Sequence, residues 1–161
     1  MKRFFTLPRA EAHCDVPCGI YDPVTAQQAA LSVVRFIDQI EETIKAGLDQ
    51  PGNQAKFSRL VAEKERHAAS VKSEIVVIWG DYFKPAHVDQ HPGIHAITHQ
   101  ILRTASACKQ ELSRQNALDL VEQVNAFAAI FWETKGIDTQ RVTVPYEPKL
   151  VITQAVFAAT N

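Results

Sequence analysis

The chain has 161 residues, enough for one domain with a substantial hydrophobic core. Hydrophobic residues make up 46% of it and charged residues 22%, a globular composition that argues against a disordered or rod-like protein. The formal net charge of −1 gives no sign of a nucleic-acid-binding surface, and no apolar run approaches the ~18 residues that a membrane span requires, so we expect neither nucleic acid nor a membrane as a partner.

Residues 1–12 differ in composition from the rest of the chain. They carry three basic residues against Glu11 alone, and their apolar stretch is shorter than the ~7–15 residues of a secretory signal. We interpret them as a leader peptide that a protease removes in the cytoplasm after Ala12. A merely frayed N-terminus is the alternative.

Residues 13–22 hold the side chains with the most distinctive chemistry. His13 is followed directly by Cys14, and Cys18 comes four residues later, so one imidazole and two thiols lie within a single turn. Sulfur and imidazole ligands together suit zinc, copper or nickel. Three side-chain ligands leave a tetrahedral zinc site incomplete. Pro17 and Gly19 allow the segment to fold back on itself.

Removal of the leader would enlarge this set of ligands. His13 would become the N-terminus, and its α-amine would lie next to the backbone amide of Cys14. An amine, a deprotonated amide and two thiolates define a square plane, which is the geometry typical of nickel(II) or copper(II). The His13 imidazole could then bind on the axis of that plane.

Four amphipathic segments follow. Apolar side chains recur in each at spacings of three and four, which predicts helices. We expect these helices at about 23–50, 54–83, 92–108 and 113–135. Asp22 and Ser113 are suited to cap the first and the fourth helix, and Pro51 and Gly136 are suited to end them.

The last segment, residues 137–161, contains two prolines and several β-branched residues and is expected to run along the surface as an extended tail. The predicted fold is therefore all-α: an antiparallel four-helix bundle at 23–136, preceded by a metal-binding hook at 13–22 and followed by this tail. With the leader at 1–12, the chain is expected to have four segments: leader, hook, bundle and tail.

Three motifs identify a family. The segment HCDVPCGIY at 13–21 resembles the nickel hook, HCxxPCGxY, of the nickel-containing superoxide dismutases, which begins at the N-terminus once a leader has been removed. WGDYFKP at 79–85 resembles the WxDYFKP segment of that family, and FWETK at 131–135 resembles its FWETK segment. The order and approximate spacing of the motifs agree, so the resemblance covers roughly residues 13–135.

The resemblance implies an enzyme that converts superoxide to dioxygen and hydrogen peroxide by a Ni(II)/Ni(III) cycle. The implied nickel ligands are the amine and imidazole of His13, the amide and thiolate of Cys14, and the thiolate of Cys18. Tyr21 is implied as a catalytic residue near the open face of the hook, with Tyr82 in its hydrogen-bond network. A cytoplasmic homohexamer and a leader-processing protease complete the expectation.

Two positions depart from the family. A glutamate on the first helix commonly bonds the hook histidine, and Ala29 stands at that position here. An arginine on the second helix is replaced by His67, with Arg66 adjacent. The sequence therefore does not identify the residues that orient His13.

Other interpretations of the same residues are less specific. Cys14 and Cys18 alone would also fit a redox dithiol, and a nickel- or copper-binding helical carrier or sensor without turnover is the alternative to an enzyme. Cys108 is expected to be a buried, inert thiol. Four histidines recur every four residues, and we expect them on the surface or at an interface rather than in a second metal site: His87, His91, His95 and His99.

Overall fold

The computed structural model of the chain describes residues 19–157. Its secondary structure consists of four long helices, one short helix, one π-helical turn and two strands. In chain order these are α1 (Val24–Lys45), α2 (Pro51–Val77), η1 (Ile78–Tyr82), α3 (Pro85–Gln90), α4 (Ile94–Gln110), α5 (Arg114–Thr134), β1 (Thr139–Thr143) and β2 (Val151–Ala155).

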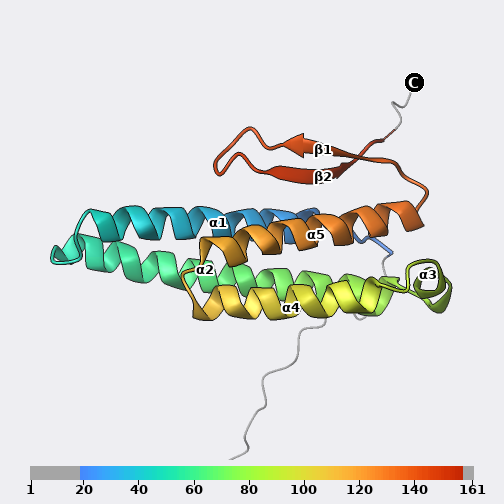
Figure 1. Cartoon of the computed structure of the whole chain (residues 1–161), viewed down its shortest axis with the longest axis horizontal. Coiled ribbons are helices and arrows are strands. Elements are labelled where there is room, and N and C mark those ends of the chain that lie inside the picture. Colours follow the sequence, from blue (N-terminus) through green and yellow to red (C-terminus); the bar gives the residue numbers. More distant parts are fainter. Residues whose placement is uncertain (1–18, 158–161) are drawn as a thin grey trace, which may run out of the picture.

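The four long helices lie side by side, with a small two-stranded sheet over α1 and α5 (Figure 1). Helix α1 packs against α2 and α5, and α4 packs against the same two helices. Each long helix contributes fully buried side chains to a shared core, for example Ile37, Val71, Ile101 and Phe127. The expectation of a mostly helical fold is confirmed. Within residues 19–157, no helix is both long enough and apolar enough to cross a bilayer.

The first two helices begin and end at somewhat different residues than expected. Helix α1 begins at Val24, whose N–H donates to Asp22 Oδ1 at 2.8 Å, and it ends at Lys45, before Gly47 adopts a φ of +92°. Pro51 does not end this helix but begins α2, because its fixed φ and missing N–H suit the first position of a helix.

The connection between α2 and α4 was only partly predicted. Helix α2 continues into the π-helical turn η1 and stops at Phe83, which is extended. Lys84 is also extended, as residues before proline tend to be, and the six-residue helix α3 then begins at Pro85. Six residues are too few to show a helical period, so the sequence did not predict α3.

Helix α5 has the ends that the sequence predicts. The Ser113 hydroxyl accepts a hydrogen bond from the N–H of Asn116 at 3.2 Å. At the other end, the N–H of Gly136 donates to Glu133 O at 2.9 Å and the N–H of Ile137 donates to Trp132 O at 3.0 Å. Gly136 has a φ of +67°, so this is a Schellman motif that needs glycine.

The C-terminal end of α4 is closed by a buried lysine from α2. Lys64 is 1% exposed, and its ammonium donates to the carbonyl oxygens of Cys108, Lys109 and Glu111 at 2.6, 2.9 and 3.0 Å. Burial lowers the pKa of this ammonium. The positive charge meets the negative end of the helix dipole, which is a favourable place for it.

The C-terminal segment forms a hairpin instead of a single extended tail. Strands β1 and β2 pair antiparallel from Thr139 opposite Ala155 to Thr143 opposite Val151. The prediction of an all-α fold is therefore wrong in this respect: the protein is mostly helical with a small sheet. The β-branched residues that indicated an extended chain are paired across the strands.

Two amides attach the hairpin to the helices. Gln27 of α1 donates to Asn125 Oδ1 at 3.0 Å and to Thr153 O at 2.7 Å. Asn125 of α5 donates to Val151 O at 2.9 Å and accepts from the N–H of Thr153 at 3.0 Å. Gln27, Asn125 and Thr153 are all buried, so these hydrogen bonds fix the hairpin on α1 and α5.

Candidate metal centre

The three predicted metal ligands, His13, Cys14 and Cys18, lie outside the described residues. From residue 19 to residue 157, no group of three or more His, Cys, Asp or Glu side chains is arranged to hold a metal ion. Within that range, His87, His91, His95 and His99 take part in no such group. The described part of the chain begins at Gly19, within the last residues of the predicted hook.

The chain leaves the predicted hook through Gly19 and Tyr21. Gly19 has a φ of +72°, a conformation that other residues rarely adopt. Tyr21 lies just before α1 and is half-buried against the core. Its ring lies 6.0 Å from the ring of Tyr82, centroid to centroid, with the planes tilted by 54°. The two tyrosines that the resemblance brought together are thus neighbours in the structure.

Tyr82 is the centre of an aromatic cluster at one end of the helices. It is the last residue of η1, and π-helical turns frequently occur at functional sites. The His87 ring is stacked on its ring at 5.0 Å and 17°, and the Phe131 ring lies 4.7 Å away. Phe83 meets it edge-on at 5.2 Å. These contacts fix the Tyr82 ring between η1, α3 and α5.

Two polar residues at the end of α5 also contact Tyr82. Its hydroxyl is hydrogen-bonded to Thr134 Oγ1 at 2.7 Å. The Lys135 ammonium lies over its ring, 4.7 Å from the centroid, and supplies a positive charge beside the tyrosines. The FWETK motif pointed to this segment, but the sequence did not show that Thr134, Lys135 and His87 meet Tyr82.

The two positions that depart from the family have partners of their own. Ala29 is buried within α1. The His67 ring lies 5.1 Å from the Phe36 ring, and its Nδ1 donates to Glu63 O at 2.8 Å. Arg66 Nε donates to the Glu63 carboxylate at 2.9 Å. His67 and Arg66 are therefore held by a residue of their own helix.

The third cysteine is isolated from this cluster. Cys108 is fully buried and free, and burial raises the pKa of its thiol to about 11. Because the thiolate is the reactive form, Cys108 is a poor nucleophile and a poor metal ligand here. The expectation of a buried, inert thiol is confirmed.

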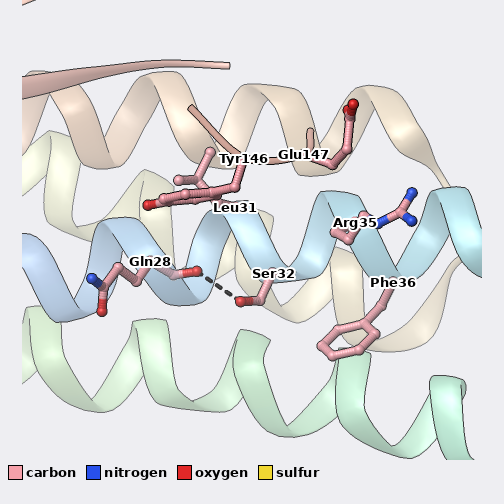
Figure 2. Close-up of a pocket in the computed structure, with 7 residues that line it drawn as sticks. All are labelled: Gln28, Leu31, Ser32, Arg35, Phe36, Tyr146 and Glu147. Atoms are coloured by element: carbon pink, nitrogen blue, oxygen red, sulfur yellow. Dashed lines mark hydrogen bonds between the residues drawn. The ribbon is translucent and has the colours of Figure 1, made fainter. Parts of the chain in front are cut away.

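A groove of about 380 Å³ lies between α1 and the loop of the hairpin (Figure 2). The ring of Tyr146 lies above Leu31, and the Ser32 hydroxyl donates to Gln28 O at 2.9 Å on the floor of the groove. None of its lining residues belongs to the aromatic cluster around Tyr82: Gln28, Leu31, Ser32, Arg35, Phe36, Tyr146 and Glu147. The groove is thus separate from the candidate site.

Comparisons with known proteins agree with the motifs. The family model described as nickel-containing superoxide dismutase matches residues 8–135. The protein named superoxide dismutase [Ni] from Streptomyces coelicolor is 39% identical over 127 residues, which are 77% of this chain and 88% of that protein. Its counterpart from Streptomyces seoulensis is 37% identical over 131 residues, 79% of this chain and 91% of that protein.

Solved structures of nickel superoxide dismutase share the fold. The native structure at 1.30 Å has a TM-score of 0.66 and 35% identity, and the match covers 76% of this chain and 99% of that chain. A structure with nickel ligation of the oxidized state has the same TM-score at 32% identity and covers 77% and 99%. The family match ends at residue 135, so the hairpin β1–β2 lies beyond it.

Proposed function

Because the chain belongs to the nickel-containing superoxide dismutase family, we propose that its nickel-dependent conversion of superoxide takes place at a hook formed by residues 13–22. Nickel is its cofactor, and superoxide is its substrate. The family match over residues 8–135, which includes the whole hook motif, carries this proposal. The contact between Tyr21 and Tyr82, next to the point where the hook joins α1, supports it.

The proposed ligands have the chemistry that nickel requires. Cys14 and Cys18 would hold nickel through their thiolates, Cys14 also through its amide, and His13 through its amine and imidazole, and this set of sulfur and nitrogen donors suits nickel. When bound, nickel supplies the Ni(II)/Ni(III) couple, through which one superoxide is oxidised to dioxygen and another is reduced to hydrogen peroxide. The amine becomes a ligand only if the bond between Ala12 and His13 is cut.

The described residues perform the supporting steps. In this proposal Tyr21 and Tyr82, whose rings are neighbours, would bound the approach to the hook and offer two hydroxyl groups beside it. Formation of hydrogen peroxide takes up two protons, for which Tyr21, water or a protonated ligand thiolate is the proposed source. Lys135 supplies local positive charge for the anionic substrate. Local charge is needed because removal of the leader, which carries +2, changes the net charge from −1 to −3.

The larger assembly is part of the proposal. We interpret the packing of α1, α2, α4 and α5 as an antiparallel four-helix bundle that supports the hook. The family resemblance supports a cytoplasmic homohexamer, in which neighbouring subunits would complete the surroundings of each hook. Light scattering of the protein without its leader tests the hexamer, and a monomer in solution would contradict it.

One experiment tests the hook. The chain beginning at His13 is loaded with nickel, superoxide loss is measured by pulse radiolysis, and the EPR spectrum is recorded. We expect rapid superoxide loss and a Ni(III) signal, and we expect both to be absent in Cys14→Ser and Cys18→Ser. The same chain with its leader is the matched control and should lack activity. An unchanged Ni(III) signal in the serine variants would refute the ligand set, and bound nickel without turnover would favour a carrier.

A further inference from the structure

The hydroxyl of Thr134 occupies a position between Tyr82 and the backbone of α5. Its Oγ1 donates to Phe131 O at 2.7 Å, a bond to its own helix. The same Oγ1 lies 2.7 Å from the hydroxyl oxygen of Tyr82. Thr134 is therefore the only link in a short chain of hydrogen bonds that runs from Tyr82 to a carbonyl group.

The number of available protons decides which hydroxyl group donates in each of these two hydrogen bonds. A threonine hydroxyl has one proton to donate, and a carbonyl oxygen can only accept. Because the Thr134 proton is directed to Phe131 O, the Tyr82 hydroxyl must donate its own proton to Thr134. The lone pairs of the Tyr82 oxygen then remain for a donor on its other side.

The packing of Tyr82 keeps its hydroxyl oxygen in place beside Thr134. Its ring is stacked on His87, and the ring of Phe131 packs against it at 4.7 Å. His87 is itself anchored, because its Nδ1 accepts from the N–H of Lys84 at 3.3 Å. With its ring held in this way, the Tyr82 oxygen cannot move away from Thr134 Oγ1 without disturbing several contacts.

We propose that Thr134 is a positioning residue that makes Tyr82 a hydrogen-bond acceptor toward the substrate side of the site. In this arrangement Tyr82 receives a hydrogen bond from Tyr21 or from a water molecule and thereby orients that donor. Tyr82 does not give its own proton to the product while the bond to Thr134 is intact. The inference rests on the proposed function, since it assigns a role within the same site.

The test compares two substitutions that differ in one hydroxyl group. Thr134→Val keeps the shape of the side chain and removes the hydroxyl, whereas Thr134→Ser keeps the hydroxyl. In the nickel-loaded chain beginning at His13, we expect Thr134→Val to lower kcat/KM by about three- to tenfold, the effect of one lost hydrogen bond. Thr134→Ser should stay within about twofold of the parent. The Ni(III) EPR signal should be the same in all three proteins.

A spectroscopic measurement tests the hydrogen bond without nickel. The chain has three tyrosines, and the difference between its Raman spectrum and that of Tyr82→Phe isolates the bands of Tyr82. These bands report whether a phenol donates or accepts a hydrogen bond. They should change in Thr134→Val and remain in Thr134→Ser. If Thr134→Val fails to fold, Thr134→Ala replaces it.

A matched control separates this role from helix stability. The Thr43 hydroxyl donates to Gln39 O at 2.7 Å within α1, so Thr43→Val removes a similar bond away from any tyrosine contact. It should change neither kcat/KM nor the Tyr82 bands. Equal activity in Thr134→Val and Thr134→Ser, or unchanged Tyr82 bands in Thr134→Val, would overturn the proposal. Loss of nickel from every protein, the parent included, would contradict the proposed hook and leave the Raman comparison to decide the role of Thr134.

Discussion

The C-terminal ends of α4 and α5 provide hydrogen-bond partners for their last backbone carbonyl groups in different ways. Each leaves backbone carbonyl groups without helical partners. At the end of α4, the N–H of the extended residue Glu111 donates to Ala107 O, and the buried Lys64 bonds the three later carbonyls of Cys108, Lys109 and Glu111. At the end of α5, the Schellman motif at Gly136 closes the helix with its own backbone. The nearby Lys135 is exposed and lies over Tyr82.

This difference shows how burial and helix closure decide what a lysine does. Where the backbone leaves carbonyls open inside the protein, the ammonium of Lys64 is tied to them and stabilises the fold. Where glycine closes the helix, the ammonium of Lys135 remains at the surface beside the tyrosines. We therefore expect substitution of Lys64 to change stability and substitution of Lys135 to change activity.

The largest expected effect is that of Lys64→Met. The substitution removes the donor from three carbonyl groups in a buried place, and we expect the free energy of unfolding to fall by about 3 kcal/mol. Chemical denaturation measures this loss. Lys56→Met, at an exposed position of the same helix, is the control and should cost less than about 0.5 kcal/mol. A cost below about 1 kcal/mol for Lys64→Met would show that Lys64 does not close α4.

Cys108, at the same end of α4, should make stability depend on pH. Burial raises its pKa from 9.0 to about 11, so the unfolded chain loses this proton at a lower pH than the folded protein does. Stability should therefore fall as pH rises from about 9 to about 11, by an amount on the order of 2 kcal/mol. Denaturation curves of the protein and of Cys108→Ala across this range isolate the effect. Parallel curves would contradict it.

Gly136→Ala tests the closure of α5. A Cβ atom at this position would meet nothing within 4 Å, so only the φ of +67° opposes the substitution. We expect a loss of about 1 kcal/mol in the free energy of unfolding. Gly93→Ala is the matched control, since it has equal space and a φ of −76°, and should be within about 0.5 kcal/mol of the parent. Equal costs at the two glycines would argue against the Schellman closure.

Lys135→Gln should have the smallest effect on stability and should act on substrate capture. Loss of one exposed positive charge beside the tyrosines should lower kcat/KM by about two- to fourfold at low ionic strength, and less in high salt. Pulse radiolysis at two salt concentrations measures it. Lys45→Gln, at the end of α1, is the control and should leave kcat/KM unchanged. A loss that does not depend on salt would assign Lys135 a role other than attraction.

The sequence predicted the parts of the molecule that have a period or a motif. Four long helices follow from apolar spacing, and the Ser113 cap and the Gly136 end were correctly located. The six residues of α3 are too few to show a period. The hairpin was missed because its attachment depends on Gln27 and Thr153, which meet only after the whole chain has folded.

The candidate site also has one part that could be predicted from the sequence and one part that could not. Residues 13–21 and Tyr82 could be singled out because their motifs are continuous in the sequence. The contacts of Thr134 and Lys135 with Tyr82 could not, because they require the end of α5 to lie beside η1. Tertiary packing brings these helix ends together, and local sequence patterns do not predict such a contact.

The two tryptophans of the chain give it a pair of intrinsic fluorescent reporters. Trp79 of η1 donates to His95 Nδ1 at 2.9 Å, so its emission should respond when α4 separates from η1. Trp132 lies between the rings of Phe131 and Phe157, at 5.0 and 5.6 Å. Its emission should shift when the end of the hairpin detaches, so single-tryptophan variants would follow the two events separately without any added dye.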